Sequence, residues 1–381
     1  MNHIFYQTKT KYSNTGDALI NYALIDALRG YGSLHANCSD GIPEDYLTLL
    51  GIREEERVLS NSELSFFKSV VSCAITSRRN GDRVFVFSGP GDMYGGGAKM
   101  VVRNIASGLI FPVFRAFGVE IVRIGRSVGP ISRLMALSER IRCMFLSHYF
   151  VRDTMSLRRC RDLGIKKVEF SPDLSWLYDA KHSKRINQTN TVMVNLRNSI
   201  FDEVHEEFVE ATLQRCEEML AQLNKAMDGQ MKVCVAYQIA EDEDFSKTIF
   251  ERLSRNYEAE YIDHQIRLDE LERYYGTVDY HISNRMHSLL AGYKYGSLPL
   301  ALIDTQKHVK IAATFSDCYL DELMFDIHGP IDVQRLLRLA HHRQETLQKL
   351  FECERSKQAQ IMSTLEYVFS EMPDRKRKAN K

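Results

Sequence analysis

Residues 279–296 have the sequence DYHISNRMHSLLAGYKYG, in which a short apolar run is followed by apolar residues at helical spacing. This pattern predicts a β-strand over Val278–Ile282 and an amphipathic helix that begins close to Arg285 and His287. A helix N-terminus offers free backbone N–H groups and a partial positive charge, to which Arg285 adds a planar cation. His287 can exchange a proton near neutral pH. The segment therefore suits an anionic substrate, although an ordinary strand-to-helix turn with capping polar residues gives the same pattern.

The segments around this stretch repeat the alternation of apolar runs and helical patterns. Such an alternation is typical of βα units on a parallel sheet. We expect strands at Val192–Leu196, Lys232–Tyr237, Glu260–Ile262, Val278–Ile282 and Leu298–Ile303. Helices are expected between them at about Glu203–Met227, Asp244–Asn256 and Leu268–Tyr275. The second half of the chain is thus predicted to form a Rossmann-like domain.

The first half of the chain has the same organisation. Strands are expected at Ile4–Gln7, Arg83–Ser88, Val119–Gly125, His148–Val151 and Lys167–Phe170. Helices are expected at Ala18–Leu28, from about Lys99, at about Ser132–Leu146 and at Thr154–Leu163. This half is predicted to be a second Rossmann-like layered domain.

Two such domains fit a chain of 381 residues, which is too long for one ordinary core. We expect an N-terminal Rossmann-like domain at 1–182, a second at 190–330, and C-terminal helices with a basic tail at 331–381. The polar residues Ala180–Thr189 form the predicted linker. Tandem α/β domains usually face each other across a cleft that holds the ligand.

Composition narrows the class of protein. Hydrophobic residues make up 44% and charged residues 26%, as in soluble globular proteins. The 50 basic and 50 acidic residues leave no net charge to attract nucleic acid, so an anion site has to be local. Eight scattered cysteines favour neither a zinc site nor a disulfide framework.

No signal peptide or membrane-spanning run is visible, so we expect a cytoplasmic protein. The basic tail Asp374–Lys381 suggests a peripheral membrane contact.

The first candidate binding motif is the polar loop Ser13–Ile20, which opens a predicted helix. Gly16 allows the backbone to approach a ligand closely, while Asn14 and Asp17 either cap N–H groups or bind sugar hydroxyls. A helix start without any function explains the same residues.

Two further motifs follow predicted strands of the first domain. Gly89, Gly91 and Asp92 come directly after a buried strand, where backbone amides can line a cleft. The stretch Gly125–Pro130 also lies where we expect a strand to end. Neither G-x-G-x-x-G nor G-x-x-x-x-G-K-[ST] is present, so dinucleotide binding and a P-loop are not indicated.

The remaining motifs place charged residues at strand ends. Asp153, Ser156 and Asp173 follow strands of the first domain, and bracing of loops is the favoured explanation for them. Arg197 and Arg285 follow two strands of the second domain. Neither arginine has an obvious local partner in the sequence, so their convergence on one mouth favours an anion site.

Taken in this order, the motifs resemble the polysaccharide pyruvyl transferase family. The matches cover Asn14–Ile20, the glycine-rich loop after Ser88, Gly125–Pro130, the Arg-Asp and Pro-Asp motifs that end at Asp173, and Arg285–Ser288. The resemblance implies a GT-B-like fold and transfer of pyruvate from phosphoenolpyruvate to two hydroxyls of one sugar, as a ketal, in polysaccharide synthesis. It implies no metal and no cofactor beyond phosphoenolpyruvate as co-substrate.

Roles follow from the resemblance and from residue chemistry. The expected donor-binding residues are Arg197, Arg285, Met286, Ser288, Gly89 and Gly91. Acceptor binding, to a glycan or a lipid-linked saccharide, is expected from Asn14, Gly16 and Asp92. His287 is the expected proton donor, and Asp17, Asp92 or the neutral histidine is the base.

Two departures from the family pattern leave points open. Pro90 stands where the family has glycine, which removes an amide donor from the loop. The family lysine is either Lys307 or Lys310.

A GT-B glycosyltransferase that uses a nucleotide sugar is the alternative enzyme, and a binding protein without catalysis is the alternative class. The acceptor sugar, the ketal stereochemistry and the oligomeric state are not encoded in these patterns.

Overall fold

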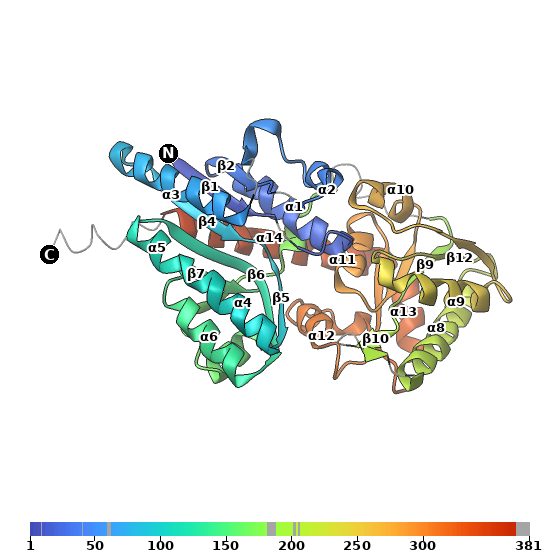
Figure 1. Cartoon of the computed structure of the whole chain (residues 1–381). Coiled ribbons are helices and arrows are strands. Elements are labelled where there is room, and N and C mark those ends of the chain that lie inside the picture. Colours follow the sequence, from blue (N-terminus) through green and yellow to red (C-terminus); the bar gives the residue numbers. More distant parts are fainter. Residues whose placement is uncertain are drawn as a thin grey trace.

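The structure, a computed structural model, describes residues 1–370 except 9, 40, 59–61, 181–187, 201–202 and 205. Two lobes lie side by side, and each is a parallel sheet covered by helices (Figure 1). Within these residues no helix has both the length and the apolar character needed to cross a membrane. Most of the predicted linker and the whole basic tail lie outside the described residues.

Within the described residues, the first lobe has an eight-stranded sheet in the order β3-β2-β1-β4-β6-β7-β8, with β5 paired to β6. All pairs are parallel, and helices cover both faces, so the middle residues of β1 and β4, Ile4–Tyr6 and Val84–Phe87, are hydrophobic and buried. The strands are β1 (Asn2–Gln7), β2 (Ser33–Asn37), β3 (Arg57–Val58), β4 (Arg83–Ser88), β5 (Gly91–Gly95), β6 (Glu120–Ile131), β7 (His148–Val151) and β8 (Val168–Phe170).

Two apolar cores cover this sheet, one on each face. One contains α1 and continues into the second lobe, and the other contains α3 to α7. The helices are α1 (Thr15–Leu28), α2 (Glu44–Leu49), α3 (Glu63–Asn80), α4 (Ala98–Gly108), α5 (Ile110–Ala116), α6 (Arg133–Cys143) and α7 (Thr154–Asp162), with the 3₁₀ helices η1 (Glu54–Glu56) and η2 (Leu174–Leu177).

The described part of the second lobe has a six-stranded parallel sheet in the order β13-β12-β9-β14-β15-β16, and β10 and β11 form a separate hairpin. The strands are β9 (Thr191–Asn195), β10 (Ser199–Ile200), β11 (Glu203–Val204), β12 (Lys232–Val235), β13 (Glu258–Tyr261), β14 (Tyr280–Ser283), β15 (Leu298–Ile303) and β16 (Met324–Asp326).

The helices of the second half cover both faces of this sheet, and the last one extends beyond it (Figure 1). They are α8 (Glu206–Ala226), η3 (Ala240–Asp242), α9 (Glu243–Leu253), η4 (Leu268–Glu270), α10 (Leu271–Tyr275), α11 (Met286–Lys294), α12 (Val309–Ser316), η5 (Asp321–Leu323), α13 (Val333–His341) and α14 (Arg343–Ser370).

Strand order in both lobes reverses at one position, between β1 and β4 in the first and between β9 and β14 in the second. Parallel α/β sheets bind ligands beyond the carboxyl ends of the strands at such a switch point. In the first lobe the segments that leave this point contain Asn14 and Asp92, and in the second they contain Arg197 and Arg285. The motifs singled out in the sequence therefore follow the strands that topology favours for ligand binding.

The sequence placed most of the central strands correctly, and three expectations were wrong. The strand expected to end at Gly125 continues to Ile131, because Gly125 adopts a positive φ of 75° and β5 supplies a new pairing partner. The glycine-rich loop after Ser88 is itself partly a strand, β5. The helix expected from Glu203 begins at Glu206, since Glu203 belongs to the hairpin of β10 and β11.

The last helix, α14, joins the two lobes. Arg343 near its start pairs with Asp279 of the second lobe at 2.8 Å. Near its end, the Phe369 ring stacks on Tyr31 of the first lobe, with the ring centroids 4.5 Å apart, and lies 4.7 Å from Phe85. The C-terminal helix therefore completes an aromatic cluster that the N-terminal segment begins.

We expect Phe369→Ala to lower the free energy of unfolding by roughly 2–4 kcal/mol, because the variant loses aromatic contacts against the sheet of the first lobe. Urea unfolding followed by circular dichroism measures this loss. Glu366→Ala on the same helix is the matched control, because that side chain is exposed and should change stability by less than about 0.5 kcal/mol. Equal stabilities of the two variants would contradict the structural role given to Phe369.

Candidate functional site

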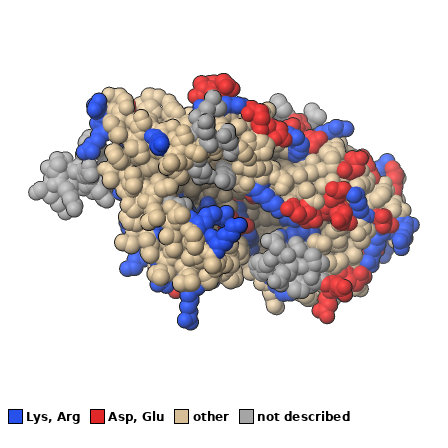
Figure 2. All heavy atoms as spheres, in the orientation of Figure 1, with Lys and Arg blue, Asp and Glu red and all other residues tan. Residues whose placement is uncertain are grey.

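Five charged or titratable side chains meet where the carboxyl ends of the two sheets face each other. We call them the interlobe cluster. Three belong to the first lobe and two to the second: Asp92, Arg152, Asp173, His287 and Lys310. They come from β5, from the segments after β7 and β8, and from the first turns of α11 and α12. The face drawn in Figure 2 is hollowed between the lobes.

Arg152 is the centre of this cluster. Its guanidinium donates to Asp92 at 2.7 Å and lies 2.9 Å from Asp173, while its Nε donates to Ser127 at 2.7 Å. The Arg152 side chain is only 5% exposed. A buried guanidinium needs paired carboxylates and hydrogen bonds to offset its lost hydration, and these partners supply them. Arg152 thereby holds two carboxylates of the first lobe in fixed positions.

His287 brings the second lobe into contact with this arrangement. Its Nε2 lies 3.4 Å from Nη1 of Arg152 and 3.6 Å from Asp173. The other face of the ring packs on Gly16 at the start of α1, where an added Cβ would lie 2.6 Å from Nδ1. Glycine at position 16 is therefore required by the close approach of the imidazole, which the sequence did not reveal.

The first residue of α1 and the loop before it also form hydrogen bonds with the second lobe. Thr15 donates its hydroxyl to the Ile266 carbonyl at 2.7 Å, and Gln265 donates to the Ser13 carbonyl at 3.0 Å. The Asn14 side chain accepts from the Gly16 and Asp17 amides and caps α1. In this structure the Asn14 side chain thus serves the helix start.

Asp92 and Lys310 form the more open side of the interlobe cluster. The Lys310 ammonium pairs with the Asp92 carboxylate across the lobes and lies 4.5 Å from the centre of the Tyr94 ring. Asp92 is 42% exposed and Lys310 29%, whereas Asp173 is 1% exposed. Lys307, the other candidate for the family lysine, is 52% exposed and lies beside Asp304. Of the two lysines, Lys310 is the one in the interlobe cluster.

The carboxylates in the cluster differ in acidity. Burial favours the neutral form of Asp92, but Arg152 and Lys310 outweigh it and lower the pKa of Asp92 to about 2. Burial likewise opposes ionisation of Asp173, and Arg152 with His287 more than compensates, so the pKa of Asp173 lies well below its usual range. Burial lowers the pKa of Lys310, partly offset by Asp92.

Asp17 behaves in the opposite way. Burial raises the pKa of its carboxyl, although Thr10 donates to it at 2.8 Å and His287 lies close enough to counteract the shift. A carboxylate with a raised pKa is a stronger base than Asp92. The two carboxyls that the sequence left unranked as proton acceptors therefore have pKa values shifted in opposite directions.

Arg197 and Arg285 come together in the second lobe because Asn284 connects the strands that precede them. The Asn284 side-chain amide accepts from the backbone N–H of Arg197 at 2.8 Å and donates to the backbone carbonyl of Arg197 at 3.0 Å. These two bonds resemble those between paired strands. Burial, together with these two arginines, lowers the pKa of the nearby His308 to about 4. Both arginines therefore lie close enough to the same buried imidazole to affect it.

Arg285 has a partner that is distant in the sequence. Its guanidinium forms an ion pair with Asp242, whose side chain is 3% exposed and which precedes α9. No local sequence pattern indicates this contact, because 43 residues separate the two positions. The buried Asp242 carboxylate orients the Arg285 guanidinium from one side. The Arg285 side chain remains 17% exposed, so part of it is still accessible.

Other predicted donor residues lie apart from the interlobe cluster or point elsewhere. The Ser288 hydroxyl is in the core of the second lobe, within reach of Tyr275 at 3.0 Å and His281 at 3.2 Å. The Met286 side chain is buried and contacts the Thr314 hydroxyl. Gly89 and Gly91 belong to the first lobe, on either side of Pro90, and Gly91 has a positive φ of 146°.

Two residues with contacts in this region, Arg152 and Asn284, were not predicted as site residues, and Asp173 was predicted only to brace a loop. Arg152 was noted only as part of a strand end, and Asn284 not at all. Asp173 was expected to brace a loop; it does cap η2 through Ser175, but it also contacts Arg152 and His287. The Nε of Arg126, in β6, has no hydrogen-bond partner among the described residues, and burial lowers the pKa of this guanidinium to about 10. Only the Arg-Asp and Pro-Asp strand ends could have indicated Arg152 and Asp173.

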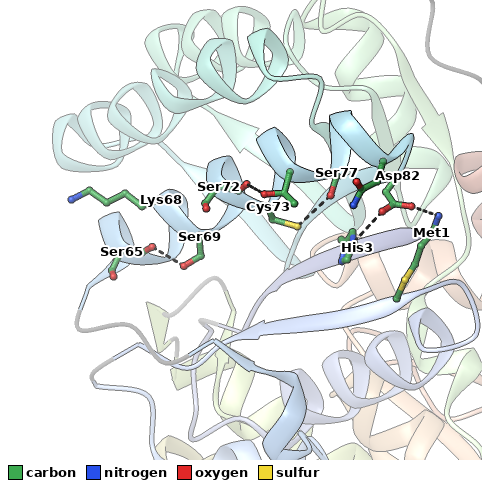
Figure 3. A pocket seen from close by; sticks show the side chains of 11 residues that line it. Met1, His3, Ser65, Lys68, Ser69, Ser72, Cys73, Ser77 and Asp82 are labelled. Atoms are coloured by element: carbon green, nitrogen blue, oxygen red, sulfur yellow. Dashed lines mark hydrogen bonds and ion pairs between the residues drawn. The ribbon is translucent and has the colours of Figure 1, made fainter.

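A separate groove runs along α3 beside the start of β1 (Figure 3). Its polar groups pair with one another: the Met1 ammonium lies 2.6 Å from Asp82, and Cys73 lies 3.6 Å from the Ser77 hydroxyl. Among the described residues no group of His, Cys, Asp and Glu side chains is arranged to hold a metal ion. The interlobe cluster is therefore the better candidate site.

Solved structures with the same architecture define the fold class. A putative UDP-N-acetylglucosamine 2-epimerase from Listeria monocytogenes matches with a TM-score of 0.56, 8% identity and 97% of each chain covered. The UDP-GlcNAc 2-epimerase from Neisseria meningitidis bound to UDP-GlcNAc matches at 0.53, 11% identity, covering 97% of this chain and 99% of the other. UGT2 of Phytolacca americana matches at 0.51 and 7% identity, covering 97% and 100%. The chain thus has the predicted GT-B-like fold.

Sequence comparison gives the family. The family model for polysaccharide pyruvyl transferase matches residues 14–296, about three quarters of the chain, and no curated protein matches. The chain belongs to the polysaccharide pyruvyl transferase family, as the order of its motifs indicated.

The ion pairs of Asp173 predict a defined pH dependence of stability. Because its folded-state pKa is depressed, the carboxylate stabilises the fold above about pH 4, and this contribution is lost as pH falls through the folded-state pKa. We expect Asp173→Asn to lower the free energy of unfolding at pH 7 by roughly 2–4 kcal/mol, because Arg152 loses a buried partner. The difference from wild type should shrink at pH 3.

Urea unfolding at the two pH values measures this effect. Asp263→Asn is the control, because that side chain is 88% exposed. A wild type and an Asp173→Asn variant that differ equally at pH 7 and pH 3 would show that the carboxylate is not coupled to Arg152 as described.

Proposed function

We propose that this family member transfers pyruvate from phosphoenolpyruvate to two hydroxyls of one sugar, as a ketal, in polysaccharide biosynthesis. The observation that carries the proposal is the position of His287. This imidazole, at the N-terminus of α11, reaches across the lobes to Arg152 and Asp173, and Lys310 joins the same cluster through Asp92. The family match supports the class of reaction.

The second lobe supplies the groups that suit the donor. Phosphoenolpyruvate carries a phosphate and a carboxylate, so its site needs several cations that are oriented but not fully neutralised. Arg285 is held by Asp242, and Arg197 lies beside it through Asn284. Lys310 extends this positive region toward the first lobe. In this proposal Lys310, not Lys307, corresponds to the family lysine.

The chemistry begins with a proton on the methylene carbon of phosphoenolpyruvate. His287 delivers that proton, and the adjacent carbon becomes an oxocarbenium-like electrophile that a sugar hydroxyl attacks. Departure of phosphate and attack by the second hydroxyl close the ketal. Two hydroxyl protons are released: one replaces the proton that His287 gave, and the other leaves with the phosphate. Asp173 and Arg152 position the ring through Nε2.

Asp17 is the base that this arrangement favours. Its raised pKa suits proton removal. Asp17 lies in the first turn of α1, and the residue before it, Gly16, packs on His287. Asp92, held ionised by Arg152 and Lys310, suits the binding of acceptor hydroxyls instead. The acceptor therefore lies against the first lobe and the donor against the second.

Replacement of His287 by Ala should lower kcat by roughly 10²–10⁴-fold, because the methylene carbon loses its proton donor. Phosphate release from phosphoenolpyruvate in the presence of glycans with neighbouring free hydroxyls measures the rate, and mass spectrometry detects the pyruvate ketal. The exposed His341, changed to Ala, is the control. Full activity of the His287 variant would remove the imidazole from the mechanism.

Donor binding gives a second test. Saturating phosphoenolpyruvate should stabilise the wild type by about 3 kcal/mol at a hundredfold excess over Kd, seen as a rise in Tm. Arg285→Lys and Lys310→Met should each reduce this rise strongly, because an ammonium cannot reproduce the fork and a thioether carries no charge. Arg255→Lys and Lys307→Met are the matched controls.

The same Tm measurement distinguishes the alternative enzyme, a glycosyltransferase, from the proposed pyruvyl transferase. A GT-B glycosyltransferase with a nucleotide-sugar donor would be stabilised by UDP, a ligand named in structures of similar fold. Stabilisation by UDP and not by phosphoenolpyruvate would replace the proposed reaction with glycosyl transfer.

A further inference from the structure

The helices α4, α5 and α6 carry an unusual concentration of exposed apolar side chains. Nine of the sixteen large hydrophobic residues that are exposed in the described part of the chain lie on or directly after these three helices. They are Val102 (65% exposed), Ile105 (48%), Leu109 (69%), Val113 (47%), Phe117 (37%), Leu134 (66%), Leu137 (51%), Ile141 (52%) and Met144 (70%). We call this surface the α4–α6 face. Contiguous exposed apolar patches on soluble proteins mark interaction surfaces.

The spacing shows that this exposure is a property of whole helix faces. On α6 the exposed residues Leu134, Leu137, Ile141 and Met144 recur at intervals of three and four, which places them on one side of the helix. The opposite side of α6 packs on the sheet and on α4, where Asn104 donates to Ser138 at 2.7 Å. The helix is thus apolar on its outer side as well as its inner side.

The helix α4 has the same character and lies directly beside α6. Its outer residues Val102, Ile105 and Leu109 are exposed, whereas Val101 and Asn104 are buried. The two helices touch closely, since a Cβ at Gly108 would lie 2.7 Å from the Arg142 side chain. Their outer stripes therefore form one surface, which α5 continues.

Charge on this face has one sign. The three helices contain five exposed basic residues, Lys99, Arg103, Arg115, Arg133 and Arg140, whereas Arg142 is only 13% exposed and pairs with Glu139. Their single acidic residue is Glu139, which is fully buried and paired with Arg123. In the view of Figure 2, the left-hand lobe is mostly tan and blue, and red atoms gather on its upper rim and on the other lobe. An apolar surface edged by cations, without exposed acids, matches an anionic lipid surface.

A second copy of the chain is a poorer match. In a symmetric dimer the same face meets itself, so the arginines of one copy would approach those of the other. The zero net charge of the chain also means that this positive surface is local and not part of a general excess.

The face adjoins the interlobe cluster. Helix α4 begins at Ala98, six residues after Asp92, and α6 begins at Arg133, directly after the strand that carries Arg126. A surface that held α4 and α6 would therefore lie next to the part of the first lobe to which the acceptor is assigned. This last point rests on the proposed function, whereas the surface itself does not.

We propose that the α4–α6 face binds the surface of an anionic lipid bilayer. The apolar stripes enter the boundary between headgroups and acyl chains, and the basic residues contact lipid phosphates. The proposed acceptor is then a saccharide carried on a lipid, presented to Asp92 at the membrane surface.

Flotation with vesicles tests the lipid contact. The full-length protein should float with vesicles of equal parts phosphatidylglycerol and phosphatidylcholine, and less with phosphatidylcholine alone. Two apolar variants should lower the bound fraction by at least about tenfold at limiting lipid. They are Leu134→Gln with Leu137→Gln and Ile141→Gln on α6, and Val102→Gln with Ile105→Gln on α4. The control is Leu64→Gln with Ile75→Gln on α3, which are exposed but lie outside the face.

The charge contribution has its own pair of variants. Arg103→Gln with Arg133→Gln should weaken binding to the anionic vesicles and reduce its dependence on salt, whereas Lys225→Gln with Arg255→Gln in the second lobe should not. Circular dichroism and the rise in Tm with phosphoenolpyruvate show whether each variant is folded, so a failure of lipid binding and a failure of the donor assignment are distinguishable.

Three results would overturn the proposal. Equal binding of wild type and both apolar variants would exclude the face. Loss of binding only when Arg375, Lys376, Arg377 and Lys378 are changed to Gln would assign the contact to the tail. Sedimentation that shows a wild-type dimer, converted to a monomer by the α6 variant, would make the face a subunit interface.

Discussion

The pairing of the buried Arg152 guanidinium is the interaction on which the interlobe cluster depends. A cation that is 5% exposed has to be matched by nearby carboxylates, so Asp92 and Asp173 are fixed relative to each other before the second lobe contributes anything. The second lobe then adds His287 beside Asp173 and Lys310 beside Asp92. The lobes thus meet through opposite charges held on rigid sheet edges, which is the preorganisation that transfer of an anionic group needs.

The sequence was sufficient for the fold class because parallel strands covered on both faces contain continuous apolar runs, such as Val84–Phe87 and Leu298–Ile303. It was insufficient where a contact joins distant positions. The Asp242 partner of Arg285 and the packing of Gly16 on His287 depend on how two lobes meet, which no local pattern encodes. The continuation of β6 past Gly125 was missed because its partner, β5, has the composition of a loop. The predicted domain boundaries remain predictions.

The positions of the three helices α4 to α6 connect the two proposals. The strand β5, which carries Asp92 of the interlobe cluster, continues into α4, whose outer side is apolar and basic. The first lobe therefore has two distinct surfaces, one that faces the second lobe and one that faces outward. The same βα units supply residues to both. An acceptor anchored in a bilayer would reach the first surface while the second holds the enzyme in place.

The return of α14 to the first lobe affects how the chain acquires its structure. The ring of Phe369 lies between Tyr31 and Phe85, so the aromatic cluster of the first lobe is finished by nearly the last described residue of the chain. Domains generally fold as they emerge from the ribosome, the N-terminal one first. Here the first lobe cannot bury that cluster until α14 has been synthesised, so its aromatic edge stays exposed while the second lobe is being made.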